Sequence, residues 1–253
     1  MVREKREIVL ALSGGGARGA YHIGVLQYLD DSDIKVKAIC GTSIGSIIAA
    51  SYASGVSPKE QLEIFKSKDL KKMFSLAWFR ESIFNVDTNT PSIDALIRKK
   101  NFEDLDIPVY VTALDLQNGD ELYFNSGDIR TLCTASSALV PVFKPVSYDG
   151  KLLVDGGFEN HLPYEPLKKY NLPLVGVNLH PLLKKKSRPR LMSYLKKVMA
   201  IRMFKTADRQ KNDYDYYIES EKINKYSIFS FKKFDELYEM GYEDAKKVFS
   251  AWV

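Results

Sequence analysis

Apolar residues in the first half of the chain alternate between short runs and stretches with helical spacing. The mainly apolar runs Ile8–Leu12, Val36–Cys40 and Pro108–Leu114 predict buried strands. Between the first two, Ala17–Asp31 has apolar positions close to helical spacing, and Ile44–Ala53 is an apolar segment rich in alanine and serine that predicts a second helix. Strands that alternate with helices in this way favour an α/β fold with a mainly parallel sheet.

The second half of the chain adds a hairpin and further strands and helices. Asn118-Gly119 is a strong turn signal before the strand "ELYFN", which predicts antiparallel pairing at one edge of the sheet. A helix is expected over Asp128–Leu139, ended by Pro141. The remaining expected elements are strands at Val142–Tyr148, Lys151–Val154 and Leu172–Leu179, and helices at about Leu191–Asn212 and Phe234–Val253.

Together these elements predict an α/β three-layer sandwich with a mainly parallel central sheet and helices on both faces. The chain has no internal repeat and no long linker, and 253 residues suffice for one large core. We therefore expect a single domain over residues 1–253. Its motif-bearing part covers about residues 6–180, and a helical part covers about residues 190–253.

Composition narrows the classes of protein. A net charge of +5 without a basic, aromatic-rich face argues against a nucleic-acid partner, but it is compatible with an anionic membrane surface. No apolar stretch reaches the length of a signal peptide or a membrane span, so we expect a soluble, cytoplasmic protein with at most peripheral membrane contact. Cys40 and Cys133 lie in apolar contexts and are expected to be buried thiols. His22, His161 and His180 have no metal-ligand spacing, so no metal is expected.

The first motif is the glycine-rich turn Gly14-Gly15-Gly16-Ala17-Arg18-Gly19, between a strand and a helix. It fits G-x-G-x-x-G, but the acidic residue that a dinucleotide fold places after the second strand is absent, and so is the lysine of a P-loop. The turn keeps free backbone N–H groups and a helix N-terminus, a geometry that binds a negative oxygen. A nucleotide site and a purely structural turn remain the alternatives.

The second motif is Gly41-Thr42-Ser43-Ile44-Gly45, a G-x-S-x-G sequence at a strand-to-helix junction. In that context the flanking glycines allow a sharp turn that exposes the serine hydroxyl as a nucleophile. The plain alternative is a serine N-cap beside turn glycines.

The third motif is Asp155-Gly156-Gly157, which follows the strand "KLLV". An aspartate at the carboxyl end of a strand lies where α/β sheets build their sites, although an ordinary Asp-Gly turn would look the same.

A serine nucleophile needs a base. The order Ser43, Asp155, His180 would suit an α/β-hydrolase triad, but Ser43 follows only the second strand, whereas that fold places its elbow later. Neither His161 nor His180 is in a position that indicates a catalytic imidazole, and His22 is expected to pack or to face solvent. A dyad of Ser43 and Asp155 is the simpler hypothesis.

The three motifs in this order resemble the patatin-like phospholipase family, and most closely its small bacterial members. The likeness runs from about Ile8 to His180 and includes "DGGFENHLPYEPL"; Ser13 stands where plant relatives have aspartate. The resemblance implies an esterase or lipid acyl hydrolase with a Ser43–Asp155 dyad, an oxyanion hole in the glycine-rich turn, and neither calcium nor another cofactor.

Within this hypothesis, N–H groups around Gly15, Gly16 and Ala17 would hold the oxyanion, and Arg18 would add charge or brace the loop. The helix-like segments Lys71–Phe84 and Leu191–Lys205 mix apolar and basic residues, and would line an acyl pocket, rest on a membrane or simply pack in the core. Lys184–Arg190 is interpreted as a solvated loop or an anionic-lipid contact. A silent lipid-binding module and an acyltransferase remain alternatives, and the oligomeric state is left open.

Overall fold

The computed structural model describes residues 6–67, 74–76, 84–86, 91–181 and 191–252. Its main sheet has eight strands within these residues, in the order β10-β9-β1-β2-β5-β8-β7, with β6 paired to β5. The strands of this sheet are β1 (Glu7–Leu12), β2 (Lys35–Gly41), β5 (Val109–Asp115), β6 (Glu121–Phe124), β7 (Val146–Tyr148), β8 (Lys151–Asp155), β9 (Leu174–Asn178) and β10 (Tyr216–Glu219); β3 (Phe74–Leu76) and β4 (Phe84–Val86) form a separate antiparallel pair.

The sheet is parallel from β10 across to β5 and antiparallel beyond it. β1 pairs in parallel with β2 and β9, β9 with β10, and β2 with β5. β6 and β8 both run antiparallel to β5, and β7 runs antiparallel to β8. The mainly parallel sheet is therefore confirmed, and so is the antiparallel hairpin expected at Asn118-Gly119.

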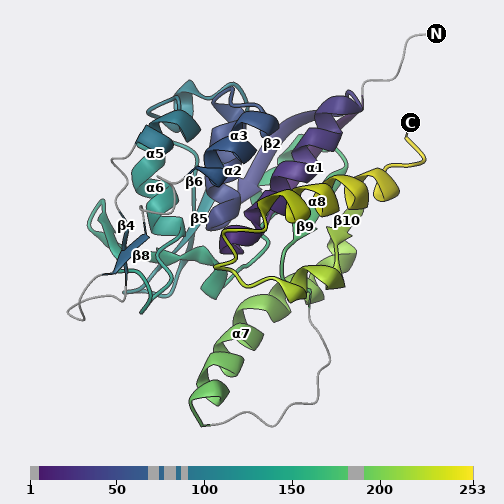
Figure 1. Cartoon of the computed structure of the whole chain (residues 1–253). Helices are drawn as coiled ribbons and strands as arrows, with labels where there is room; N and C mark the ends of the chain where they lie inside the picture. The colour runs from purple at the N-terminus through teal and green to yellow at the C-terminus, as the bar shows by residue number, and fades with distance from the viewer. Residues whose placement is uncertain (1–5, 68–73, 77–83, 87–90, 182–190, 253) are drawn as a thin grey trace.

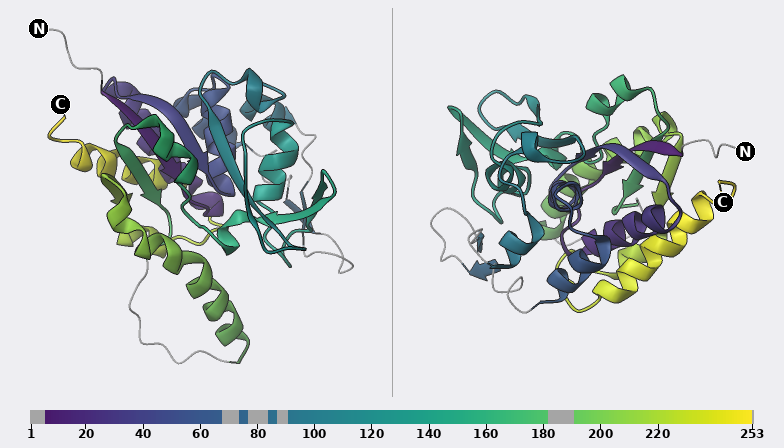
Figure 2. Two further views of the ribbon diagram at one scale, coloured as in Figure 1. Left: turned by 180° about the vertical axis from the view of Figure 1, so that it is seen from behind. Right: turned by 90° about the horizontal axis from the view of Figure 1, so that it is seen from above.

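Helices cover both faces of the sheet, as expected for a three-layer α/β fold. On one face α1 packs along α8, and α2 and α3 lie beside them (Figure 1; Figure 2, right). The other face has a smaller core, closed by η4 and by Ala207 near the end of α7. The α-helices are α1 (Ala20–Asp31), α2 (Ile44–Ala53), α3 (Pro58–Lys66), α5 (Pro91–Leu96), α6 (Ile129–Ser136), α7 (Leu191–Arg209) and α8 (Phe234–Val248). The 3-10 turns are η1 (Gly16–Gly19), η2 (Phe102–Asp104), η3 (Gly156–Phe158), η4 (Glu165–Tyr170), η5 (Lys211–Asp213) and η6 (Glu221–Lys225).

Most elements lie where the hydrophobic pattern placed them. The helix Ile44–Ala53 has the predicted bounds, while the helix expected from Ala17 begins as the 3-10 turn η1 before α1. The strand expected over Val142–Tyr148 is shorter, since β7 starts only after Pro145, which has no N–H to donate to a ladder. The sequence analysis missed α3, although Ser57 and Glu60 form a capping box at its start.

Two segments singled out for substrate access fall partly or wholly outside the described residues. Of Lys71–Phe84, only Phe74–Leu76 and Phe84 are described, and they belong to strands rather than to a helix. Lys184–Arg190 lies outside the described residues altogether. Among the helices that are described, none is long and apolar enough to cross a bilayer. The single domain over residues 1–253 stays a prediction.

Candidate active site

Ser43 stands at a strained turn between β2 and α2. Its backbone has φ 53° and ψ −124°, a conformation that non-glycine residues adopt only where the surrounding structure enforces it. A Cβ on Gly45 would lie 2.4 Å from the carbonyl oxygen of Leu12, so glycine is needed for α2 to start against the end of β1. The Ser43 N–H donates a hydrogen bond of 2.9 Å to Ser136 Oγ on α6. The G-x-S-x-G motif thus forms the sharp strand-to-helix turn that the sequence predicted.

Asp155 reaches Ser43 from an antiparallel strand. It is the last residue of β8 and pairs with Ala113, two residues beyond the point where β5 pairs with Gly41 at the end of β2. Asp155 lies at the carboxyl end of a strand, as the sequence predicted, but this strand, β8, runs antiparallel to β5. Its carboxyl end therefore comes back to the level at which β2 ends.

The Asp155 carboxyl is buried beside Ser43 in the wall of the same cavity. Its Oδ1 accepts a hydrogen bond of 2.8 Å from the Gly157 N–H. Burial raises the pKa of Asp155 to about 7, and interactions with the Gly157 N–H and the Ser43 side chain only partly offset that rise. At neutral pH the carboxyl is consequently close to half ionised, whereas a free aspartate would be a much weaker base.

Of the three N–H groups predicted to hold the oxyanion, those of Gly15, Gly16 and Ala17, two are free within the described residues and one is not. In the described part of the chain, the N–H groups of Gly15 and Gly16 have no hydrogen-bond partner. The N–H of Ala17 donates to the Ile228 carbonyl at 2.8 Å, and that of Arg18 to the Gly15 carbonyl at 3.2 Å. Gly16 has φ 56°, and a Cβ there would lie 2.6 Å from the Ile228 oxygen, so the turn requires glycine.

The Arg18 side chain braces the turn. Its Nε and Nη2 donate to the Tyr226 carbonyl at 2.9 and 2.7 Å, and Nη1 donates to the Leu179 carbonyl at 2.8 Å. Burial lowers the pKa of Arg18 to about 10, which leaves the guanidinium charged at neutral pH. Of the two roles left open by the sequence, the contacts favour the structural one, because each of the three guanidinium nitrogens donates to a backbone carbonyl.

Two histidines that the sequence analysis set aside lie in the wall of the site. His161 Nε2 and His180 Nδ1 are 3.2 Å apart, and the His180 ring stacks on Phe204 at 3.9 Å between centroids. Burial lowers the pKa of His161 to about 3 and that of His180 well below its usual value, so both are neutral. Since Asp155 accepts from the Gly157 N–H and His180 contacts His161, the geometry does not support a Ser43–Asp155–His180 triad.

The other residues considered for special chemistry are structural. His22 is fully buried and its Nε2 lies 2.8 Å from the Ser13 carbonyl, so it packs in the core and does not face solvent. Cys40 and Cys133 are buried free thiols, as predicted. No cluster of three or more His, Cys, Asp or Glu within the described ranges could hold a metal ion.

Ser43 and Asp155 open into a cavity of about 250 Å³ with a mostly apolar wall. This volume is just below the usual range of ligand pockets, about 300–1,000 Å³. Much of the wall comes from the C-terminal part of the chain, in which the sequence analysis found no usable motif. The apolar lining includes Phe65, Ile93, Leu96, Phe143, Met203, Phe204, Ile228, Phe229, Phe231 and Phe234. Met203 and Phe204 belong to Leu191–Lys205, for which lining an acyl pocket was one of the expectations. No local signal marks Ile228, Phe229, Phe231 and Phe234 as site residues, because only the chain's return past Gly16 brings them there.

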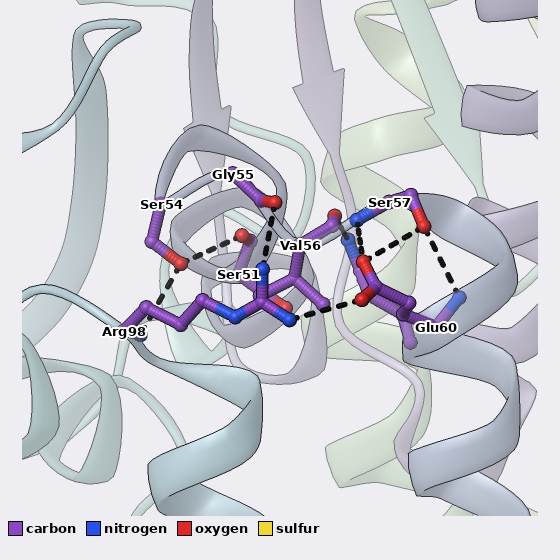
Figure 3. Close-up of polar contacts among 8 residues, drawn as sticks. Ser51, Ser54, Gly55, Val56, Ser57, Glu60 and Arg98 are labelled. Atoms are coloured by element: carbon purple, nitrogen blue, oxygen red, sulfur yellow. Dashed lines mark hydrogen bonds and ion pairs between the residues drawn. The ribbon is translucent and has the colours of Figure 1, made fainter.

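The part of this wall formed by α3 and α5 is held by a polar network around Arg98, shown in Figure 3. The Arg98 guanidinium donates to the Gly55 carbonyl at 3.1 Å and to Glu60 Oε1 at 3.0 Å. Glu60 in turn accepts from the N–H and hydroxyl of Ser57, which caps α3. The network ties the segment after α5 to the start of α3, and so fixes the relative position of the two helices that carry Phe65 and Leu96.

A comparison with known families now bears on this geometry. A family model described as patatin-like phospholipase matches residues 10–168, more than half of the chain. The chain belongs to the patatin-like phospholipase family. The resemblance inferred from the three motifs is thereby confirmed, and residues 10–168 contain all three of them.

Two curated relatives extend the match to nearly the whole chain, and a third covers about two thirds of it. Patatin-like phospholipase domain-containing protein 6 of Mus musculus is 30% identical over 284 aligned positions, covering 97% of this chain and 21% of that protein. Lysophospholipase NTE1 of Scheffersomyces stipitis is 24% identical over 96% of this chain and 18% of its own length. An uncharacterised NTE family protein of Mycobacterium bovis is 28% identical over 68% of this chain and 49% of its own length. The chain thus spans about a fifth of the first two relatives.

Solved structures with the same fold have diverged far in sequence. VipD from Legionella pneumophila superposes with a TM-score of 0.60 at 12% identity, covering 98% of this chain and 67% of that one. The type III effector protein ExoU gives a TM-score of 0.50 at 16% identity, covering 97% of this chain and 53% of that one. These likenesses support the patatin-like α/β fold.

Proposed function

We propose that this protein is a lipid acyl hydrolase that cleaves carboxylic esters through a Ser43–Asp155 dyad. The observation that carries the proposal is the position of Ser43, on a strained strand-to-helix turn, in the same cavity as a buried carboxyl whose pKa is raised to about 7. Membership of the patatin-like phospholipase family supports the same chemistry. A relative named as a lysophospholipase supports lysophospholipids among the candidate substrates, alongside phospholipids and simple esters.

In the proposed mechanism, Ser43 Oγ attacks the ester carbonyl while its proton moves to the Asp155 carboxylate. The negative charge that develops on the carbonyl oxygen would be held by the N–H groups of Gly15 and Gly16, which have no other partner in the described residues. Loss of one such donor typically costs about 3–4 kcal/mol of transition-state stabilisation. The alcohol then leaves with the proton from Asp155, and the same carboxylate activates the water that releases the acyl group from Ser43.

The neutral imidazoles of His161 and His180 have a supporting role in this proposal. They form part of the cavity wall beside the dyad, and their low pKa values keep positive charge away from Asp155. A cationic neighbour would lower the pKa of Asp155 and weaken it as a base.

The test is labelling with a fluorophosphonate probe, read by intact mass and peptide mapping, beside turnover of a soluble short-chain ester. We expect one adduct on Ser43, absent in Ser43→Ala and strongly slowed in Asp155→Asn together with turnover. Ser137→Ala is the matched control, because Ser137 also lines the cavity but lies outside the elbow. Folded wild-type protein with neither adduct nor turnover would favour a silent lipid-binding module, and an acylated alcohol formed in place of free acid would indicate an acyltransferase.

A further inference from the structure

Helix α7 carries apolar side chains on two opposite faces. Tyr194, Val198 and Ile201 are 52%, 62% and 44% exposed, and their spacing of four and then three residues places them in one stripe along the helix. We call these three residues the α7 stripe. Figures 1 and 2 (left panel) show α7 extending away from the layers of the fold, so the outer side of the helix is presented to the surroundings.

The inner face of α7 already provides the packing that holds the helix to the protein. Met203 and Ala207 are buried, and Phe204 stacks on His180 in the cavity wall. Burial of one apolar face is what a surface helix needs, and its other face is normally polar. The α7 stripe is therefore not explained by core packing, and exposed apolar patches of this kind mark interaction sites.

The charge of α7 indicates the kind of partner. The α7 sequence has five basic residues and one acidic residue, Asp208. Of the basic side chains that the structure describes, Lys205 and Arg209 are exposed, whereas Arg202 forms an ion pair of 2.7 Å with Glu159. Lys205 is exposed and continues the stripe one turn beyond Ile201. Apolar side chains flanked by lysine and arginine are typical of helices that lie in the interface of an anionic bilayer. A second copy of the chain fits less well, since a twofold contact along the stripe would bring these like charges together.

The opposite face of α7 belongs to the cavity wall. Phe204 lines the cavity, and so does Phe229, which is 50% exposed. A bilayer in contact with the α7 stripe would lie across the helix from this wall and would hold the protein at a lipid surface. The relevance of the cavity rests on the proposed function, whereas the exposure and the charge of α7 do not.

We propose that the α7 stripe docks the protein on the surface of an anionic phospholipid bilayer. Tyr194 suits the polar–apolar boundary of such a surface, and Val198 and Ile201 would insert below it. Lys205 and Arg209 would contact the anionic head groups.

The test is co-sedimentation of the full chain with vesicles of phosphatidylcholine alone and of phosphatidylcholine with 30% phosphatidylglycerol. We expect binding to the anionic vesicles, and a loss of about tenfold or more in partitioning for the double variant Val198→Glu/Ile201→Glu. Glutamate is a good helix former, so α7 should persist, which circular dichroism and thermal unfolding check. Leu116→Glu is the matched control, because Leu116 is 49% exposed but belongs to the turn after β5.

Several outcomes would overturn the proposal. They are equal binding of the double variant and wild type, no binding of wild type to either vesicle, or an equal loss with Leu116→Glu. A double variant that changes the mass of the protein in light scattering without changing vesicle binding would identify the stripe as a contact between copies instead. Turnover of a soluble ester, measured on the same samples, separates the two proposals. If wild type turns over the ester but does not bind vesicles, only the docking proposal is refuted. If wild type binds vesicles but does not turn over the ester, only the proposed function is refuted.

Discussion

The buried carboxyl of Asp155 should make this protein less stable as the pH rises. Asp155 is 3% exposed, and burial raises its pKa from 3.8 to about 7. Between these two values the folded protein keeps a proton on this carboxyl that the unfolded chain has released. The folded state then binds more protons than the unfolded state, so this group lowers the free energy of unfolding by about 1.4 kcal/mol per pH unit.

The size of the effect follows from the shift. About three pH units at about 1.4 kcal/mol each give a full cost near 4 kcal/mol, complete above pH 7 and absent below pH 4. Asp155→Asn removes the titration and keeps an oxygen that can accept the Gly157 N–H. Between pH 5 and pH 8, the variant's free energy of unfolding should therefore rise relative to wild type by about 3 kcal/mol.

The assay is urea unfolding of both proteins at pH 5, 6, 7 and 8. The difference between the two curves isolates Asp155, because every other titrating group is shared, and only the pH dependence of the difference is interpreted. Wild-type kcat/KM on a soluble ester should also fall below about pH 7, since a protonated Asp155 cannot accept the Ser43 proton. A difference that stays flat from pH 5 to pH 8, or an activity that falls only near pH 4, would refute the raised pKa.

Three further substitutions test the framework of the site. Arg18→Gln should lower the free energy of unfolding by about 2–4 kcal/mol in urea, because it removes a buried charged group that makes three hydrogen bonds to carbonyls. Gly24→Ala should cost about 3 kcal/mol or more in thermal unfolding, since the new Cβ would lie 1.9 Å from the Tyr238 oxygen and force α1 away from α8. Ser136→Ala should lower kcat on a soluble ester more than it changes KM, because the strained Ser43 loses the partner of its N–H.

Each of these has a clear negative result. Unchanged urea stability in Arg18→Gln would mean that the guanidinium does not brace the turn. An unaltered melting temperature in Gly24→Ala would contradict the close approach of α1 and α8. Ser136→Ala with normal kcat would show that the elbow keeps its geometry without that hydrogen bond.

The sequence by itself determined the elements of the site and its likeness to a family. Glycines at a strand-to-helix turn, a serine between two glycines and an aspartate before two more are local patterns, because each reports the backbone shape of a few neighbouring residues. Short apolar runs that alternate along the chain with segments of helical spacing likewise predicted the mainly parallel sheet. Ser43, Asp155, Gly15 and Gly16 accordingly lie around one cavity.

Only the tertiary structure decided how those elements work together. The antiparallel course of β8 returns Asp155 to the level of Ser43, and burial there sets its pKa. The N–H of Ala17 donates a hydrogen bond to the carbonyl of Ile228, a residue 211 positions away. No sequence pattern near the glycine-rich turn predicts this contact. The histidine pair and the cavity-wall residues Ile228, Phe229, Phe231 and Phe234 have the same origin. Burial and cavity walls depend on which distant segments meet, and a local pattern carries no information about that meeting.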